Sequence, residues 1–138
     1  MIQRVQSVYL ILGAAALVAS FFVGEIGREA HTVVAWFIPA AGGSLLASSA
    51  AATISIFLFG NRRRQRTSIV AAQYVTLASL VVVFLGMYFS GTLPSSRTFA
   101  LSSWLALVLP LLAFLMLRLA RKGVDADIKL IKSVDRLR

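Results

Sequence analysis

The side chains with the greatest chemical capacity in this chain are cations, and they gather in two places. They are Arg62, Arg63, Arg64 and Arg66 in one short segment, and Lys129, Lys132 and Arg136 near the end of the chain. Guanidinium and ammonium groups bind phosphate and carboxylate oxygens, and each contributes about 1 kcal/mol of attraction to an anionic membrane surface. These residues therefore predict contact with anionic lipid headgroups or with an acidic protein partner.

Other chemistry is poorly supported by the sequence. The chain has no cysteine, which excludes thiol nucleophiles, disulfides and cysteine-ligated metals. Its one histidine, His31, shares a short loop with Glu25 and Glu29, which is weak support for a metal site. No Ser/His/Asp set or pair of carboxylates suggests catalysis. We therefore predict a protein that is not an enzyme, with no catalytic residues, no metal and no cofactor.

Four long apolar segments must position the cations. The chain has 138 residues, 59% of them hydrophobic, and a mean hydropathy of +0.85. A helix needs about 20 apolar residues to cross the hydrocarbon core of a bilayer. The segments that meet this length are Val5 to Gly24, Ala40 to Gly60, Ser68 to Ser90 and Phe99 to Leu117. Met1 to Ser20 also has features of a signal peptide, but the apolar run continues to Val23 and favours a spanning helix.

The distribution of positive charge predicts the orientation. Of the 14 Lys and Arg residues, Arg28 and Arg97 fall in the first and third loops, and the other twelve fall on the opposite face. The positive-inside rule places that face in the cytoplasm, together with both termini. Because topology accounts for the net charge of +9, the charge does not indicate a nucleic-acid partner.

Two patterns inside the spans predict how the helices associate. Small residues recur every four positions in the second span, and Ala47 and Ala51 at its centre predict close helix packing within the bundle. The same stripe also suits a homo-oligomer or another membrane subunit. Ser55 and Gln73 lie five residues inside the expected boundaries of the second and third spans, which predicts a hydrogen bond between these helices.

The end of the chain predicts an amphipathic helix over residues 121–138, separate from a transmembrane domain at 1–120. Apolar residues recur there at spacings of four and three, at Val124, Ile128, Ile131, Val134 and Leu137. Asp125 precedes Lys129 by four residues, as in a favourable helical ion pair. Such a helix would lie on the bilayer surface or bind a partner protein.

The two ends of the chain resemble a known family. The opening MIQRVQSVYL and the ending SVDRLR are similar to the termini of small four-helix membrane proteins of Bacteroidetes, a family catalogued as a domain of unknown function. The resemblance implies a four-span fold in the inner membrane of a Gram-negative bacterium. It implies no activity, substrate or catalytic residue.

Together these patterns predict an all-α integral membrane protein, a four-helix bundle with a C-terminal amphipathic cytoplasmic helix. The expected function is that of a structural or accessory subunit of the bacterial inner membrane. Its basic cytoplasmic face would meet anionic lipid headgroups, a membrane-protein partner or another copy of the chain. The alternative is a passive channel or transporter of a small solute.

Overall fold

The chain folds into four long helices in the computed structural model, which describes residues 2–23, 36–91, 93 and 101–135. The helices are α1 (Ile2–Phe22), α3 (Phe37–Phe57), α4 (Arg62–Ser90) and α5 (Leu101–Asp135). A single 3₁₀ turn, η1 (Leu58–Gly60), follows α3 directly. The described residues contain no β-strand.

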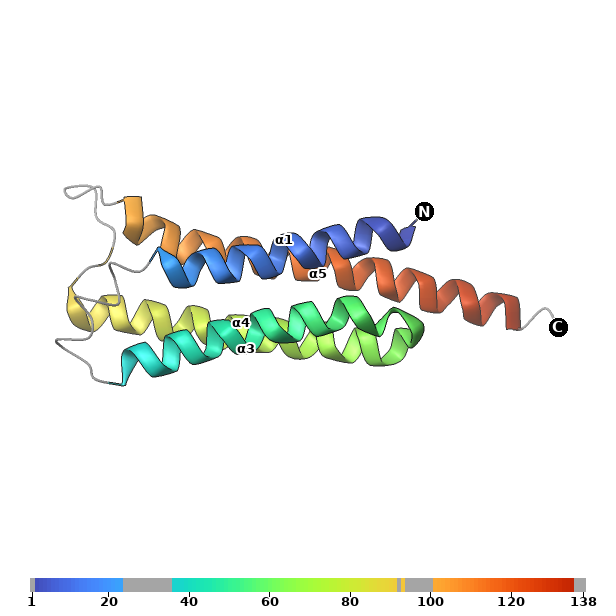
Figure 1. Ribbon diagram of the computed structural model, residues 1–138, viewed down its shortest axis with the longest axis horizontal. Helices are drawn as coiled ribbons and strands as arrows, with labels where there is room; N and C mark the ends of the chain where they lie inside the picture. The colour runs from blue at the N-terminus through green and yellow to red at the C-terminus, as the bar shows by residue number, and fades with distance from the viewer. Residues whose placement is uncertain (1, 24–35, 92, 94–100, 136–138) are drawn as a thin grey trace.

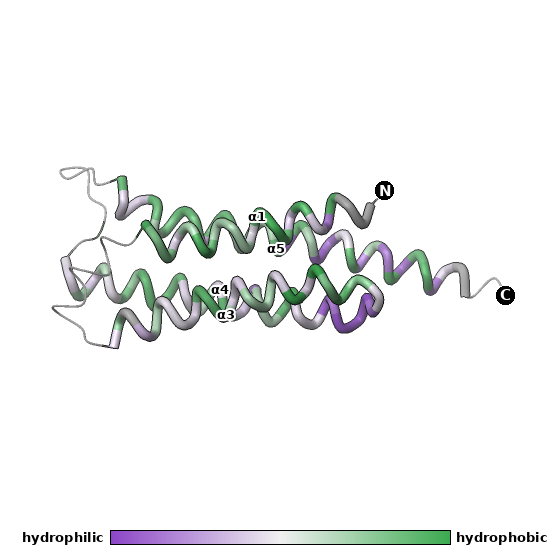
Figure 2. Tube along the Cα trace, in the orientation of Figure 1, coloured by the Kyte–Doolittle hydropathy of each residue, from purple (hydrophilic) through white to green (hydrophobic). Residues whose placement is uncertain are grey.

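The four helices form one antiparallel bundle. Each helix packs against two others, so that α1 contacts α3 and α5, and α4 contacts α3 and α5. Figure 1 shows that α1 begins and α5 ends at the same end of the bundle, where η1 also lies. We call this the charged end, because Figure 2 shows the hydrophilic residues concentrated there on α4 and α5.

All four helices are long and apolar enough to span a membrane. The qualifying segments are Val5–Phe22, Pro39–Gly60, Arg62–Ser90 and Leu101–Ser133. Many large apolar side chains point out of the bundle, including Phe22, Val81 and Leu111. Because lipid tails solvate such side chains, this outward-facing surface is the expected one for a bilayer. The predicted all-α, multi-pass membrane protein is therefore confirmed.

Three apolar clusters fill the interior along the bundle. Leu10, Ile69 and Leu117 belong to the cluster nearest the charged end. Leu17, Leu45 and Ala113 belong to the second cluster, and Phe37, Met87 and Ala106 belong to the third. Small residues let the backbones approach closely, as at Gly13, where a Cβ would lie 3.5 Å from the Ala113 carbonyl oxygen.

The predicted separate tail helix is wrong for the described residues. Residues 121–135 continue α5 without a break. No proline or capping residue interrupts the helix after Leu117, and Val124 is fully buried in the first cluster. Gly123 weakens a helix by only about 1 kcal/mol, which this packing offsets. The amphipathic pattern therefore belongs to the last turns of a spanning helix.

Candidate functional site

The arginine segment is helical, which corrects the predicted loop over residues 61–67. Asn61 caps α4 in extended conformation, and its side-chain oxygen accepts a hydrogen bond from the Arg64 backbone N–H at 3.1 Å. Asn is a preferred N-cap residue, and arginine is a good helix former. Arg62 and Arg66 therefore lie on the first turns of α4, one turn apart, and both face α5.

A set of polar side chains, which we call the inner network, joins all four helices at the charged end. Gln6 of α1 donates from Nε2 to Asp127 Oδ2 of α5 at 3.0 Å. Arg62 Nη2 lies 3.8 Å from the same oxygen, and each of these two side chains is only 14% exposed. Arg62 also donates to Gln65 Oε1 at 3.0 Å, and Gln65 donates to the Ser55 carbonyl of α3 at 3.1 Å.

The inner network is tightly packed. Gln6 is 2% exposed and Gln65 is 3% exposed. A Cβ at position 123 would lie 2.7 Å from Gln6 Cγ, so α5 approaches α1 closely only because Gly123 has no side chain. Gln6 Oε1 is buried and has no hydrogen-bond partner within the described residues. Since buried polar groups weaken a fold when unpaired, the amide is held here by its single bond to Asp127.

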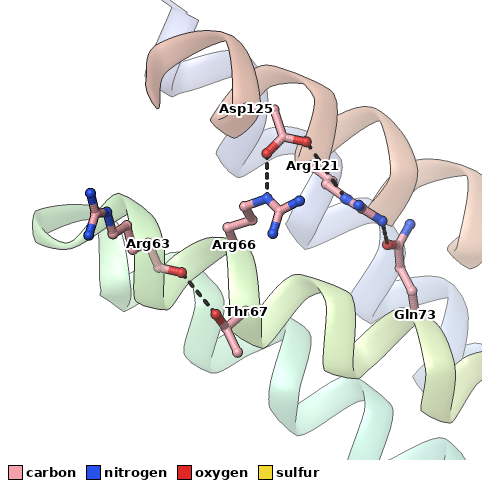
Figure 3. A network of polar contacts seen from close by, with 6 residues as sticks. All are labelled: Arg63, Arg66, Thr67, Gln73, Arg121 and Asp125. Carbon is pink, nitrogen blue, oxygen red and sulfur yellow. Dashed lines mark hydrogen bonds and ion pairs between the residues drawn. The ribbon is translucent and has the colours of Figure 1, made fainter. Parts of the chain in front are cut away.

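A second set, the outer network, joins α4 to α5 nearer the surface (Figure 3). Asp125 accepts a hydrogen bond from Arg66 Nε at 2.6 Å, and its other oxygen lies 3.7 Å from Arg121 Nε. Arg121 in turn donates to Gln73 Oε1 at 3.4 Å. Asp125 thus pairs with Arg66 and Arg121 in place of the expected Lys129. On the exposed side, Thr67 donates to the Arg63 carbonyl at 3.1 Å.

A groove of about 390 Å³ runs beside the outer network, between α4 and α5. Its apolar lining comes from Tyr74, Leu77 and Phe114. Its polar lining comes from Gln73, Arg118, Arg121, Lys122 and Asp125. Both Asp125 oxygens face arginines, whereas Arg118 and Lys122 have no ion-pair or hydrogen-bond partner in the described part of the chain. The groove therefore offers positive charge to an anion.

The remaining predicted cations are exposed or undescribed. Arg63, Arg64, Lys129 and Lys132 are all exposed on the charged end, where they can meet lipid or a partner. Arg136 lies outside the described residues, as do Glu25, Glu29 and His31. Among the residues that are described, no three His, Cys, Asp or Glu side chains are close enough to hold a metal ion.

The predicted bond between Ser55 and Gln73 is wrong. Ser55 Oγ donates to Ala51 of its own helix, and Gln73 pairs with Arg121. The tight turn at Gly60 and Asn61 sets Ser55 level with Gln65, eight residues earlier in α4 than expected. The hydroxyl contact between these helices is instead Ser48 with Thr76, and Ser48 also donates to the Ala72 carbonyl at 3.0 Å.

The two alanines predicted for helix packing have different environments. Ala51 is half-buried against the first apolar cluster, and its carbonyl accepts a hydrogen bond from Ser68 of α4 at 3.1 Å. Ala47 is exposed, so it does not pack inside the bundle. The buried face of α3 is offset by one position and carries Ser48 and Ala52.

The residues that sequence interpretation missed are Gln6, Gln65, Asp125 and Asp127. A signal was available, because Asp125 and Asp127 are carboxylates on a strongly cationic face and Gln6 is an amide within an apolar run. Opposite charges and isolated amides near a membrane boundary indicate contacts between helices. Which partners they meet required the register of α4.

The comparisons with known proteins add one finding. A family model described as Domain of unknown function (DUF4293) matches residues 2–137. No curated protein and no solved structure matches the chain.

Proposed function

This chain belongs to the family of the Domain of unknown function (DUF4293), and we propose that it is a non-catalytic accessory subunit of the bacterial inner membrane. Both termini lie in the cytoplasm, and the charged end presents a basic face to lipid headgroups and to a protein partner. The positive-inside rule supports this orientation, because Arg62, Arg66 and the cations of the last part of α5 share that end.

The observation that carries the proposal is the projection of α5 beyond the bundle. Figure 1 shows the last turns of α5 extending past the start of α1 and past η1. The 35 residues of α5 span about 52 Å at 1.5 Å per residue, well beyond the roughly 30 Å hydrocarbon core. Leu130 and Ile131 are 56% and 54% exposed on this projection, beside Lys129 and Lys132.

A fixed base makes the projection suitable for docking. The inner and outer networks attach α5 to α1 and α4 through Asp127 and Asp125, directly before the exposed turns. A rigid helix that displays adjacent apolar and basic residues can dock into an apolar groove rimmed by acidic residues. Because the exposed turns continue a spanning helix along the bundle axis, they favour a partner above the membrane over burial at its surface.

The middle of the bundle supports an accessory subunit over a passive channel. A water-filled path needs hydroxyls or carbonyls that remain free to solvate the solute. Thr76 and Ser79 donate to carbonyls of their own helix at 2.8 Å, and Ser48 bonds across to α4. These hydroxyls are fully buried, so they serve contacts between and within helices.

Purification of the full chain from its source membrane in native nanodiscs, with mass spectrometry, tests the proposal. We expect one protein at fixed stoichiometry in the wild type. The L130S/I131S variant is expected to lose it, because the apolar contact on α5 is removed.

The matched control is Ser133→Ala, an exposed position on the same turns, which is expected to retain the partner. Recovery of the wild-type chain alone, or equal retention by L130S/I131S and Ser133→Ala, contradicts the accessory role and redirects attention to solute flux in liposomes.

A further inference from the structure

We propose that the groove between α4 and α5 binds one anionic phospholipid. The phosphate lies against Arg118, Lys122 and the side-chain amide of Gln73, and an acyl chain runs along Tyr74, Leu77 and Phe114. The inference rests on the proposed function only for the orientation of the charged end. It adds a defined site and a ligand class to a face that is otherwise simply basic.

Charge complementarity is the first argument for this occupant. Arg118, Arg121 and Lys122 surround the groove, against one carboxylate, Asp125. That carboxylate is already neutralised, because its two oxygens face Arg66 and Arg121. Basic pockets between membrane helices at the cytoplasmic side bind the headgroups of anionic lipids. A phosphate therefore meets a positive environment with no uncompensated negative charge.

Unused hydrogen-bond donors are the second argument. Gln73 is 6% exposed, and its Oε1 accepts from Arg121, which turns the amide nitrogen to the groove as a donor. Within the described chain that nitrogen, the Arg118 guanidinium and the Lys122 ammonium have no protein acceptor. A buried amide donor needs an acceptor, and a phosphate oxygen provides one.

The apolar wall selects a lipid over free phosphate. Tyr74 is 69% exposed and Leu77 is 41% exposed, and both lie on α4 below the cationic rim. Phe114 of α5 lies one turn before Arg118, on the side of the hydrocarbon core. An acyl chain covers these side chains while its headgroup meets the cations, whereas inorganic phosphate uses only the rim. A volume of about 390 Å³ is also in the range of small-ligand sites.

Native mass spectrometry of the purified full chain in a neutral detergent tests the site. Phosphatidylglycerol and phosphatidylcholine with identical acyl chains are titrated separately. We expect the wild type to retain one phosphatidylglycerol at least about tenfold more tightly than phosphatidylcholine. The R118Q/K122Q variant is expected to lose that preference, because two cations contribute about 1 kcal/mol each and 1.4 kcal/mol is a factor of ten.

The charge-matched control is K129Q/K132Q, which removes two positive charges from α5 outside the groove. We expect it to change phosphatidylglycerol affinity less than about threefold, as short-range contacts are absent there. Equal losses in the two variants would show diffuse attraction and would overturn the site. Equal binding of phosphatidylcholine by the wild type would do the same.

Two further arms protect the test. Leu77→Trp keeps every charge but fills the apolar wall, and we expect it to weaken phosphatidylglycerol binding as well. Competition by inorganic phosphate or glycerol 3-phosphate at millimolar concentration would identify free phosphate as the ligand and refute the lipid. A negative result here leaves the partner on α5 untouched, because that partner is assayed through Leu130 and Ile131.

Discussion

The two ends of the bundle are held together in different ways. At the charged end, Gln6, Arg62 and Asp127 join the helices through hydrogen bonds and an ion pair. At the opposite end, Phe37 of α3 packs directly on Gly86 of α4 beside the third apolar cluster. Lipid tails give little hydrophobic force between helices, so packing and interhelical bonds must provide the association. This protein uses packing where the helices meet hydrocarbon and polar bonds where they meet the interface.

The largest effect is expected from Gly86→Ala. A Cβ at this position would overlap the Phe37 ring, which is 3% exposed and has little room to move. Overpacking of this kind destabilises a fold by about 3 kcal/mol at its upper range. Unfolding in mixed detergent micelles, followed by circular dichroism, measures the loss.

The control is Gly43→Ala, since nothing lies within 4 Å of that position. It is expected to leave stability unchanged or to raise it by up to about 1 kcal/mol through helix propensity. Similar stabilities for the two variants would show that the tight contact between Phe37 and Gly86 does not hold the apolar end together.

Asp127→Ala is expected to have the next largest effect, at the charged end. It leaves the buried Gln6 amide and the Arg62 guanidinium without their shared acceptor, which weakens folding by about 2 kcal/mol. Asp125→Ala removes a more exposed carboxylate and is expected to lower stability by less than about 1 kcal/mol. The two variants have the same net charge, so a larger loss for Asp125→Ala in the same unfolding assay would reverse the assigned importance of the two networks.

Gly123→Ala sharpens the contrast with Gly86, because its neighbour is a bendable amide and not an aromatic ring. The added Cβ displaces Gln6, while alanine favours the helix by about 1 kcal/mol, so the two effects largely cancel. Removing the amide in Q6A/G123A relieves the contact and should reduce the coupling measured in a double-mutant cycle. A destabilisation as large as that of Gly86→Ala would mean that both ends rely on steric fit.

The smallest effect is expected midway between the ends, from Ser48→Ala. Its hydroxyl contacts Thr76 and the Ala72 carbonyl, and hydrogen bonds between helices in bilayers average about 0.6 kcal/mol. Ser44→Ala, which loses only a bond within α3, is the control and should be close to neutral. A loss above about 2 kcal/mol for Ser48→Ala in thermal melts would indicate a polar core that bears more of the stability than either end.

Hydropathy was sufficient to predict the number of helices and their approximate limits, because every spanning segment must be both long and apolar. It was insufficient for register. The eight-residue displacement between Gln65 and Gln73 follows from the cap at Asn61, a local hydrogen bond that hydropathy does not record. Part of the candidate site was accessible, since Arg62 and Arg66 were expected to bind anions. Their actual acceptors, Asp127 and Asp125, lie about 60 residues away along the chain and emerge only from the packing of α4 on α5.

The pairing of α1 with α5 also dictates the order in which the protein can be built. During translation α3 and α4 emerge in succession and can insert as a hairpin through the short turn at Gly60 and Asn61. Helix α1 must wait in the bilayer until α5 leaves the ribosome, and until then Gln6 has no carboxylate to bond. Closure of the bundle is therefore the last event of biogenesis, and a nascent chain arrested before α5 would offer an open seam to membrane proteases and chaperones.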